Sequence, residues 1–300
     1  MSTLLAARDL CKSYGDIIAL DGVDFEITDG VTGLLGANGA GKSTAIKLFL
    51  GLISPTRGVA EVMGEDASAS VEIRARLGYM PEHDCLPGNV SAAEFLTHMA
   101  ELSGLPPAQA RSRAADTLRH VGLFEERYRS MGGYSTGMKQ RVKLAQTLVH
   151  DPVLVLLDEP TAGLDPGGRE EMLTLIRRTG QEFGISLLLS SHLMGDIERT
   201  CDNIIVLDNG HVVETGAVTS FIEETETLAI EVDTNRDAVI TALRERGLEA
   251  ELDGSTIVIE GVIGDDYDVI RDAIVAADAP LRRLAPRRHE LTEIFERQDS

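Results

Sequence analysis

Alternating apolar and polar positions precede residue 30, and segments dominated by apolar residues follow it. Val23, Phe25 and Ile27 alternate with acidic residues, which is the period of a half-exposed antiparallel strand. The later apolar segments indicate strands buried on both faces of a parallel sheet, and they lie at 31–35, 153–157 and 185–189. The pattern predicts an α/β fold in which an antiparallel β layer precedes a parallel sheet.

A mostly helical stretch occupies residues from about 88 to 150. Ser91 and Glu94 have the spacing of a capping box, which predicts a helix that begins there and continues through Met99. A second helix is expected after Pro106-Pro107. We expect this stretch to form a helical subdomain inserted into the α/β unit.

The pattern changes again toward the end of the chain. Asp208-Asn209-Gly210 stands between two apolar runs and predicts a β-hairpin. After residue 224 the order becomes βαββαβ, which is that of a ferredoxin-like α+β domain. Its strands are expected at 227–232, 248–252, 256–259 and 280–284, and its helices at 236–246, 265–277 and 290–297. Because fold order does not give function, we assign residues 225–300 only an accessory role in regulation or dimer support.

Acidic residues outnumber basic ones, and the net charge is -21 with a pI near 4.7. Residues 225–300 contain 18 acidic residues, 9 arginines and no lysine. Such a surface repels nucleic acid and anionic lipid, so no nucleic-acid partner is expected. The acidity also suggests a source adapted to high salt, a hypothesis that predicts stability rising with KCl. Four arginines form a local basic cluster: Arg282, Arg283, Arg287 and Arg288. We interpret the cluster as the solvated edge of a strand, in preference to a surface that contacts a partner or lipid.

Cysteine usage and hydropathy limit the location of the chain. Cys11, Cys85 and Cys201 are scattered and lack C-x-x-C spacing, so we expect neither a disulfide framework nor a metal site, and a reducing environment fits them. No apolar run reaches the ~18 residues of a membrane span, and no basic segment precedes an apolar leader. We expect a soluble chain that is not secreted and that reaches a membrane only through another protein.

Residues Gly36-Ala37-Asn38-Gly39-Ala40-Gly41-Lys42-Ser43 match the phosphate-loop pattern G-x-x-x-x-G-K-[ST], between a predicted strand and a predicted helix. The three glycines are expected to take φ > 0 and to turn N–H groups toward phosphate oxygens. Lys42 would bridge the β- and γ-phosphates, and Ser43 would offer its hydroxyl to Mg²⁺ at a helix N-terminus. The expected nucleotide-binding residues here are Gly36, Asn38, Gly39, Ala40, Gly41, Lys42, Ser43 and Thr44.

The apolar run that begins at Val153 ends in two adjacent carboxylates, Asp158 and Glu159. Asp158 would hold Mg²⁺ through its water shell, and Glu159 would orient and polarise the water that attacks the γ-phosphate. Alone, such a pair is more often an acidic loop after a core strand. The phosphate loop upstream reverses that preference.

Tyr134-Ser135-Thr136-Gly137-Met138-Lys139-Gln140-Arg141 resembles the L-S-G-G-Q signature of ATP-binding cassette (ABC) transporters. The resemblance to their nucleotide-binding subunit covers roughly residues 3–220. It implies two cassettes packed head to tail, with Ser135 and Gly137 facing the γ-phosphate that the partner chain holds. The hydroxyl of Ser135 and the uncrowded backbone N–H of Gly137, both at a helix N-terminus, are suited to binding an anion. An ordinary capped helix is the alternative. Thr136 replaces the first signature glycine and Met138 the glutamine, which puts a side-chain contact from position 138 in doubt.

Other segments resemble further elements of that family. Tyr79-Met80-Pro81-Glu82 resembles the Q-loop, with Glu82 in place of the usual glutamine as an expected Mg²⁺ ligand. Ala162-Gly163-Leu164-Asp165 resembles the D-loop that crosses the dimer, and the resemblance assigns nucleotide contact to Asp165. Ser190-Ser191-His192 resembles the switch-histidine segment, so His192 would donate to the γ-phosphate. Tyr14 is expected to stack on adenine.

The resemblance implies an ATPase in which Lys42, Glu159 and His192 are catalytic, ATP and Mg²⁺ are the cofactors, and ATP closes a dimer of identical or related chains. The implied partner is a separate membrane permease, which would hold this cytoplasmic chain at the inner face of the cell membrane. The single cassette, the glutamate Q-loop, the signature and the C-terminal domain resemble export systems more than importers.

Two other classes of function compete with this one. A soluble cassette ATPase acting in DNA repair, translation or cofactor assembly is the alternative, and it is disfavoured because the chain shows no second cassette and no long heptad insertion. A nucleotide-sensing scaffold without turnover would lack Glu159 or His192, and both are present. The sequence does not name the transported substrate, which the membrane chain would select.

Overall fold

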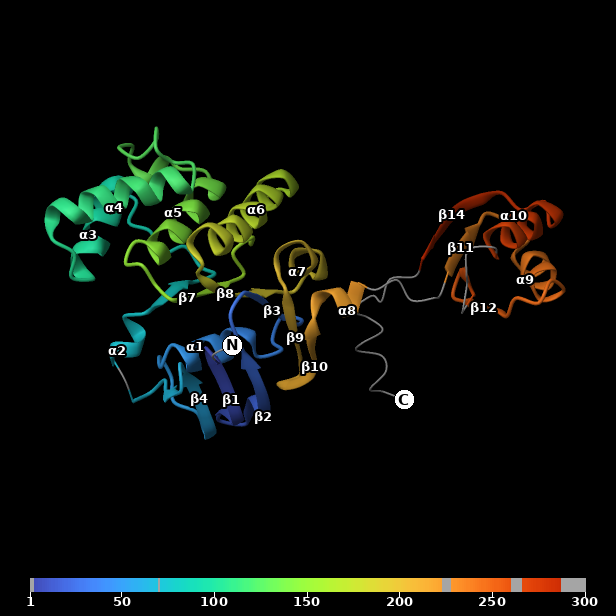
Figure 1. Cartoon of the computed structure of the whole chain (residues 1–300), viewed down its shortest axis with the longest axis horizontal. Helices are drawn as coiled ribbons and strands as arrows, with labels where there is room; N and C mark the ends of the chain where they lie inside the picture. The colour runs from blue at the N-terminus through green and yellow to red at the C-terminus, as the bar shows by residue number, and fades with distance from the viewer. Residues whose placement is uncertain (1–2, 70, 223–227, 260–265, 287–300) are drawn as a thin grey trace. The chain divides into compact units, whose positions relative to one another are not determined.

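A computed structural model describes residues 3–69, 71–222, 228–259 and 266–286 (Figure 1). Two compact units make up the chain, Met1–Val218 and Thr219–Ser300. The boundary between them therefore lies a few residues before position 224, after which the sequence pattern predicts the second domain. The helix expected at 290–297, together with Arg287 and Arg288, lies outside the described residues. No helix in the described ranges combines the length and the apolar character that a membrane crossing requires.

The first unit begins with an antiparallel sheet of strand order β2-β1-β4-β5. Its strands are Leu5–Tyr14 (β1), Ile17–Ile27 (β2), Arg57–Val62 (β4) and Glu65–Asp66 (β5). Along the second half of β2, Val23, Phe25 and Ile27 are buried and the acidic residues between them are exposed. The alternation therefore predicts this layer correctly.

A six-stranded mixed sheet forms the centre of the unit, in the order β10-β9-β3-β8-β7-β6. Its strands are Val31–Leu35 (β3), Leu77–Met80 (β6), Leu154–Asp158 (β7), Ser186–Ser191 (β8), Asn203–Asp208 (β9) and His211–Ala217 (β10). Strands β3, β7 and β8 pair in parallel and are buried along their whole length, which confirms the predicted core. The turn Asn209-Gly210 joins β9 to β10 as an antiparallel hairpin, also as predicted. Because parallel strands end at one edge, the residues that follow β3, β7 and β8 gather there.

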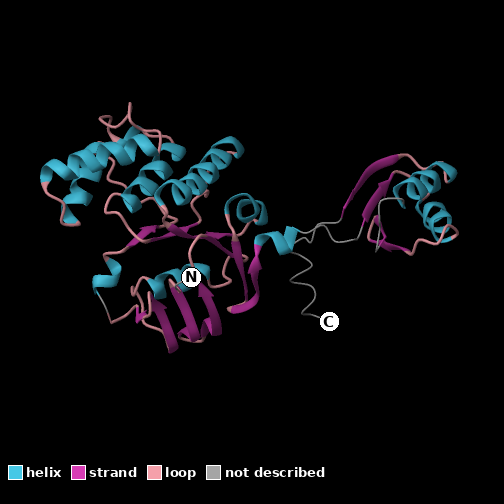
Figure 2. Ribbon diagram, in the orientation of Figure 1, coloured by secondary structure: helices cyan, strands magenta, loops and turns pink. Residues whose placement is uncertain are grey.

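Helix α1 (Lys42–Phe49) follows β3 and lies between the two sheets (Figure 2). Its buried face includes Ile46 and Phe49, and the Phe49 ring lies 5.7 Å from the ring of Phe25 on β2, centroid to centroid. Burial of a side chain of this size contributes about 2 kcal/mol. This packing fixes the start of α1, and with it the phosphate loop, at the edge of the mixed sheet.

The other helices of the first unit lie around the mixed sheet. They are α2 (Val71–Arg74), α3 (Ala92–Leu102), α4 (Pro107–His120), α5 (Thr136–Leu148), α6 (Pro166–Phe183) and α7 (Met194–Thr200). A short helix, α8 (Val218–Ile222), begins at the last residue of this unit and continues into the second. Figure 1 shows α3, α4 and α5 gathered away from the antiparallel sheet, as expected of a helical subdomain. The predicted capping box is present, because Ser91 Oγ accepts from the backbone N–H of Glu94 and the Glu94 carboxylate accepts from that of Ser91. A single 3₁₀ turn, Met131–Gly133, leads into α5.

The second unit follows the βαββαβ order that the sequence predicts. Its elements are β11 (Leu228–Val232), α9 (Arg236–Arg244), β12 (Ala250–Asp253), β13 (Thr256–Ile259), α10 (Asp266–Ala276) and β14 (Leu281–Pro286). The sheet is antiparallel with the order β12-β13-β11-β14. Strand β14 is at the sheet edge, where Arg282 and Arg283 form ion pairs with Asp233 and Glu231. Both side chains are largely exposed at this edge, so the choice between a solvated edge and contact with a partner or lipid stays a prediction.

Candidate functional site

The phosphate loop connects the carboxyl end of β3 to the first turn of α1. Gly39 and Gly41 have φ angles of 92° and 108°, which residues with a side chain rarely adopt, as the sequence predicts. The same expectation is wrong for Gly36, whose φ is not positive. A Cβ at Gly36 would lie 2.4 Å from the carbonyl oxygen of Leu207, so close packing against the end of β9 explains this glycine.

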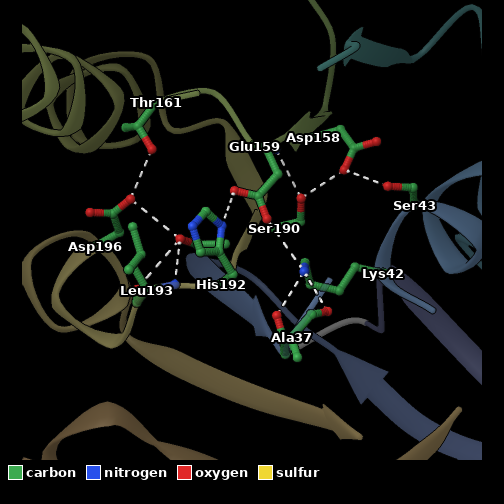
Figure 3. A network of polar contacts seen from close by, with 12 residues as sticks. Ala37, Lys42, Ser43, Asp158, Glu159, Thr161, Ser190, His192, Leu193 and Asp196 are labelled. Atoms are coloured by element: carbon green, nitrogen blue, oxygen red, sulfur yellow. Dashed lines mark hydrogen bonds and ion pairs between the residues drawn. The ribbon is translucent and has the colours of Figure 1, made fainter. Parts of the chain in front are cut away.

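Lys42 is 6% exposed, and its ammonium lies inside the loop that carries it. Its Nζ donates to the carbonyl oxygens of Gly36 at 2.7 Å and Ala37 at 3.1 Å. The same Nζ is 3.3 Å from Oε1 of Glu159, as Figure 3 shows. The positive charge is therefore held between the loop backbone and the carboxylate that follows β7.

Asp158, the last residue of β7, accepts two hydroxyl hydrogen bonds on one oxygen. Ser43 Oγ donates to Oδ1 of Asp158 at 3.1 Å, and Ser190 Oγ donates to the same atom at 2.8 Å. Ser190 stands opposite Asp158 in the parallel pairing of β7 with β8, which explains the contact. Hydrogen bonds of this kind satisfy an oxygen of a buried carboxylate, which would otherwise be costly to remove from water.

Glu159 follows Asp158 at the point where the chain leaves the sheet. Its φ is 46°, a left-handed conformation that is uncommon for a residue with a side chain and that recurs at functional sites. Its Oε2 is 3.0 Å from Nδ1 of His192. Its buried Oε1 forms the ion pair with Lys42 but has no hydrogen-bond donor among the described residues. This oxygen is therefore an unsatisfied acceptor in the interior of the site.

Asp196, in the first turn of α7, connects the loops that follow β7 and β8. Its Oδ2 accepts from Oγ1 of Thr161 at 2.9 Å and from Oγ of Ser191 at 3.3 Å, and its Oδ1 accepts from Nε of Arg169 at 2.7 Å. Sequence reasoning missed this residue, because one acidic residue after His192 carries no distinctive signal and its partners lie on other elements. The network fixes the backbone on both sides of the Glu159–His192 pair.

An open cavity of about 350 Å³ lies over the phosphate loop. Its lining comprises Asn38, Gly39, Gly41, Lys42, Ser43, Thr44, Glu82, Glu159 and His192, together with Ala19 and Ala162. Residues predicted from four separate segments of the sequence therefore surround one space. Ala19 was not predicted because alanine has no reactive group, and Ala162 was known only as part of the D-loop segment. Gly36 and Ala40 do not line the cavity; Ala40 is buried, and the Gly36 carbonyl accepts from Lys42.

The remaining predicted residues do not line this cavity. Tyr14 ends β1 with 45% of its surface exposed, and Nζ of Lys12 is 5.1 Å from its ring centroid. Ser135 is the N-cap of α5 and accepts from the backbone N–H of Met138 at 3.3 Å, and Gly137 lies in the same first turn. Asp165 is the N-cap of α6 without a side-chain capping bond. Ser135 and Asp165 are exposed at helix N-termini, whose free backbone N–H groups favour anions.

Two oxygen-bearing side chains that line the cavity, together with Asp158 beside Ser43, fit Mg²⁺. The Ser43 hydroxyl and the Asp158 carboxylate are in direct contact, and Glu82 faces the same space. Mg²⁺ takes hard oxygen ligands and commonly uses one or two carboxylates together with phosphate oxygens and water. These residues therefore fit the metal that a bound nucleoside triphosphate brings.

Comparison with known proteins agrees with this geometry. The family model of ABC transporters matches residues 20–162. The bacitracin transport ATP-binding protein BcrA of Bacillus licheniformis is 38% identical over 216 residues, which cover 71% of this chain and 70% of BcrA. The methionine import ATP-binding protein MetN of Caulobacter vibrioides is 37% identical over 72% of this chain and 67% of its own length. The Nod factor export ATP-binding protein I of Burkholderia orbicola is 36% identical over 72% of this chain and 71% of its own.

A solved structure supports the same relationship. CbiO1 of Clostridium perfringens, part of an ABC transporter complex, is 29% identical and superposes with a TM-score of 0.68, covering 73% of this chain and 90% of CbiO1. The matched share of this chain is consistent with the first unit, which carries all of the site residues. The chain belongs to the ABC transporter family, as one of its ATP-binding, ATP-hydrolysing subunits.

Proposed function

We propose that the cavity over the phosphate loop hydrolyses ATP with Mg²⁺ and that the cycle drives export through a separate membrane permease. The observation that carries the catalytic part is the carboxylate of Glu159. The residue lines the cavity, its carboxylate lies between Lys42 and His192, and its buried Oε1 has no hydrogen-bond donor in the part of the chain that the structure describes. A general base needs such an acceptor within reach of the attacking water.

In this proposal the phosphate loop binds the triphosphate. Its backbone N–H groups and the N-terminus of α1 point toward the phosphates, and Lys42 supplies a point charge to the β- and γ-phosphates. Ser43, Asp158 and Glu82 hold Mg²⁺, which when bound neutralises charge that accumulates on the phosphates. Thr44 and Asn38 contact the nucleotide from the lining of the cavity, and Tyr14 stacks on the adenine from the neighbouring sheet.

Glu159 and His192 carry the hydrolytic step. Oε1 of Glu159 accepts a hydrogen bond from the attacking water and aligns it with the γ-phosphorus. His192 steadies the other carboxylate oxygen and donates to the γ-phosphate. A neutral imidazole carries one N–H, so a His192 ring that donates from Nδ1 to Glu159 has no proton on Nε2. To donate to the γ-phosphate as well, His192 must either carry both protons or give up its hydrogen bond to Glu159.

The site is completed by a second chain in this proposal. Ser135, Gly137 and Asp165 lie outside the cavity of their own chain, at the exposed starts of α5 and α6. Head-to-tail packing of two cassettes would bring the signature turn of each chain to the γ-phosphate of the other. The partner is either a second copy or a related cassette, and the C-terminal unit supports or regulates the pairing.

The membrane part of the proposal rests on the relatives and on sequence features. BcrA is named for bacitracin transport and the Burkholderia protein for Nod factor export, whereas MetN is named for import. We propose export because Glu82, the Ser-Thr-Gly-Met signature and the C-terminal unit resemble export systems. The chain then acts in the cytoplasm, held at the membrane by its permease. No observation favours a soluble cassette ATPase acting in repair, translation or cofactor assembly.

The test is purification of the tagged full chain from its own membranes in mild detergent and high salt, followed by mass spectrometry. A multi-span permease is expected with the wild-type chain, and its identity would indicate the substrate class. The untagged chain, carried through the same purification, controls for non-specific capture of membrane proteins. Recovery of only soluble partners would overturn the transport proposal without affecting the assignment of the ATPase site.

A further inference from the structure

Two lysines on α5 contact the segment that follows β6. Nζ of Lys143 donates to the backbone carbonyl of Glu82 at 2.9 Å. Nζ of Lys139, one turn earlier, is 2.7 Å from Oδ2 of Asp84. Helix α5 is also the helix that Ser135 caps, so these contacts join the signature helix to the wall of the cavity where Glu82 lies.

Lysine is rare in this chain, and one of these two is buried. Only five of the 28 basic residues are lysine, and the side chain of Lys143 is almost completely inaccessible, with 3% of the residue exposed. A compact ammonium can be satisfied by one carbonyl and nearby carboxylates, whereas the five donors of an arginine fork need more partners. Burial lowers the pKa of Lys143, and the neighbouring acidic groups, which include Asp84, Glu82 and Asp158, oppose that effect.

A second set of contacts joins the segment after β6 to residues 130–132, which directly precede the signature helix α5. Backbone N–H groups of Met131 and Gly132 donate to the carbonyls of Val90 at 3.0 Å and Gly88 at 2.8 Å. The Ser130 hydroxyl also donates to the Gly88 carbonyl, at 2.6 Å. Residues 82–90 are therefore attached to the signature region at both ends, by Lys143 at one end and by backbone hydrogen bonds at the other.

Glu82 brings an additional negative charge to a cavity that already contains Glu159 and that would hold a triphosphate. A negative group beside a phosphate is repelled unless a positive charge or a metal offsets it. Lys143 does not line the cavity, but its ammonium sits directly behind the backbone of Glu82. Its charge and its hydrogen bond therefore act on the same residue.

We propose that Lys143 is a positioning residue for hydrolysis, which fixes Glu82 against the signature helix and offsets the charge of its carboxylate. This inference rests on the proposed function, because Glu82 matters only if the cavity binds the triphosphate with its metal. Lys143 acts through Glu82 and does not contact the nucleotide. In this proposal the carboxylate of Glu82, which lies beside the bound nucleotide, is positioned by α5, the helix whose N-terminus contacts the partner chain's nucleotide.

The test is a kinetic comparison in the full chain of Lys143→Met, Glu82→Gln and the double variant. In Lys143→Met, kcat for MgATP should fall about tenfold or more, the usual effect of losing a buried hydrogen bond to a charged group. KM should change less than about threefold, because a residue that acts through Glu82 affects the reaction more than binding. In the Glu82→Gln background the loss from Lys143→Met should shrink by about threefold or more, because part of the repulsion is already removed.

The control is Lys47→Met, which makes the same chemical change at an exposed position on α1 and should leave kcat near the wild-type value. If Lys143→Met does not fold, Lys143→Gln is measured by the same criteria. An unchanged kcat, or an equal loss in both backgrounds, would overturn the inference. A wild-type chain without MgATP hydrolysis would instead overturn the proposed function, so the two failures are distinguishable.

Discussion

Nδ1 of His192 lies 3.0 Å from Oε2 of Glu159, and Nζ of Lys42 lies 3.3 Å from the other oxygen of that carboxylate. His192 and Glu159 directly follow β8 and β7, and Lys42 begins the helix after β3, so one edge of the parallel strands assembles all three residues. The carboxylate is held from two sides without a hydrogen bond to Oε1 from the described residues. Its orientation is therefore set before substrate arrives, as a general base requires.

Replacement of His192 by alanine should slow hydrolysis while nucleotide binding persists. The ring steadies Glu159 and is placed to donate to the γ-phosphate, so kcat should fall about 10²-fold, at the low end for a group that takes part in proton transfer or charge stabilisation. Steady-state ATPase assays and equilibrium nucleotide binding measure the two effects separately. His211→Ala, at an exposed position on β10, is the matched control. Equal loss of binding and turnover would contradict the assignment.

Gly41→Ala should abolish nucleotide binding. The position has φ of 108°, and an added Cβ would lie 2.6 Å from both the Ala19 carbonyl oxygen and a methyl group of Leu20. Forcing this conformation on alanine costs about 1–3 kcal/mol before the steric clash is included. Gly195→Ala, where the added Cβ meets no heavy atom within 4 Å beyond its own helix and its chain neighbours, should bind nucleotide normally. Equilibrium dialysis with labelled ATP distinguishes the variants, and wild-type affinity in Gly41→Ala would refute the structure of the loop.

Ser135→Ala should weaken ATP-dependent pairing of two cassettes more than it weakens ATP binding by one. The hydroxyl caps α5, so its loss should also cost about 1 kcal/mol of stability. Ser91→Ala removes the cap of α3 at a similar cost and should leave pairing unchanged, which makes it a matched control. Analytical ultracentrifugation with ATP measures the pairing. If both variants pair as the wild type does, the signature turn does not contact the nucleotide of the partner.

His120 should make the first unit less stable in mild acid. Burial lowers its pKa, although Glu182 opposes the effect, and its Nε2 is 2.8 Å from the Thr179 hydroxyl. The unfolded chain binds the proton with a pKa of about 6.5, so the stability from the neutral ring is present above that pH and is lost as pH falls below it. Denaturant unfolding at pH 7.5 and 5.5 should show a smaller change in His120→Gln than in the wild type. The same change in both chains would contradict this prediction.

The sequence predicts most of the elements because their signals are local. The alternation along β2, the apolar run of β7 and the capping box at Ser91 each involve neighbouring residues, and all three are present. The phosphate loop was equally clear, yet Gly36 was explained by φ and proves to need space beside Leu207. That carbonyl belongs to β9, far along the chain, and no local pattern indicates its approach.

The supporting residues of the site were hidden for the same reason. Asp196 depends on Thr161 and Arg169, and Lys143 depends on a backbone carbonyl at Glu82. Each pairing follows from the order β3-β8-β7-β6 and from the placement of α5 on β6, which periodicity does not give. Residues with a named chemical role were predicted, whereas those that position them became visible only in three dimensions.

The central claim is that Glu159 is the base of an ATPase that works as a pair of cassettes. It is tested most directly by measuring MgATP hydrolysis and molecular mass for the wild type and Glu159→Gln under the same conditions. The amide keeps the shape of the side chain but is a far weaker base, so turnover should fall by about 10² or more. The variant should accumulate as an ATP-bound dimer at saturating nucleotide. Hydrolysis at the wild-type rate by Glu159→Gln would contradict the account.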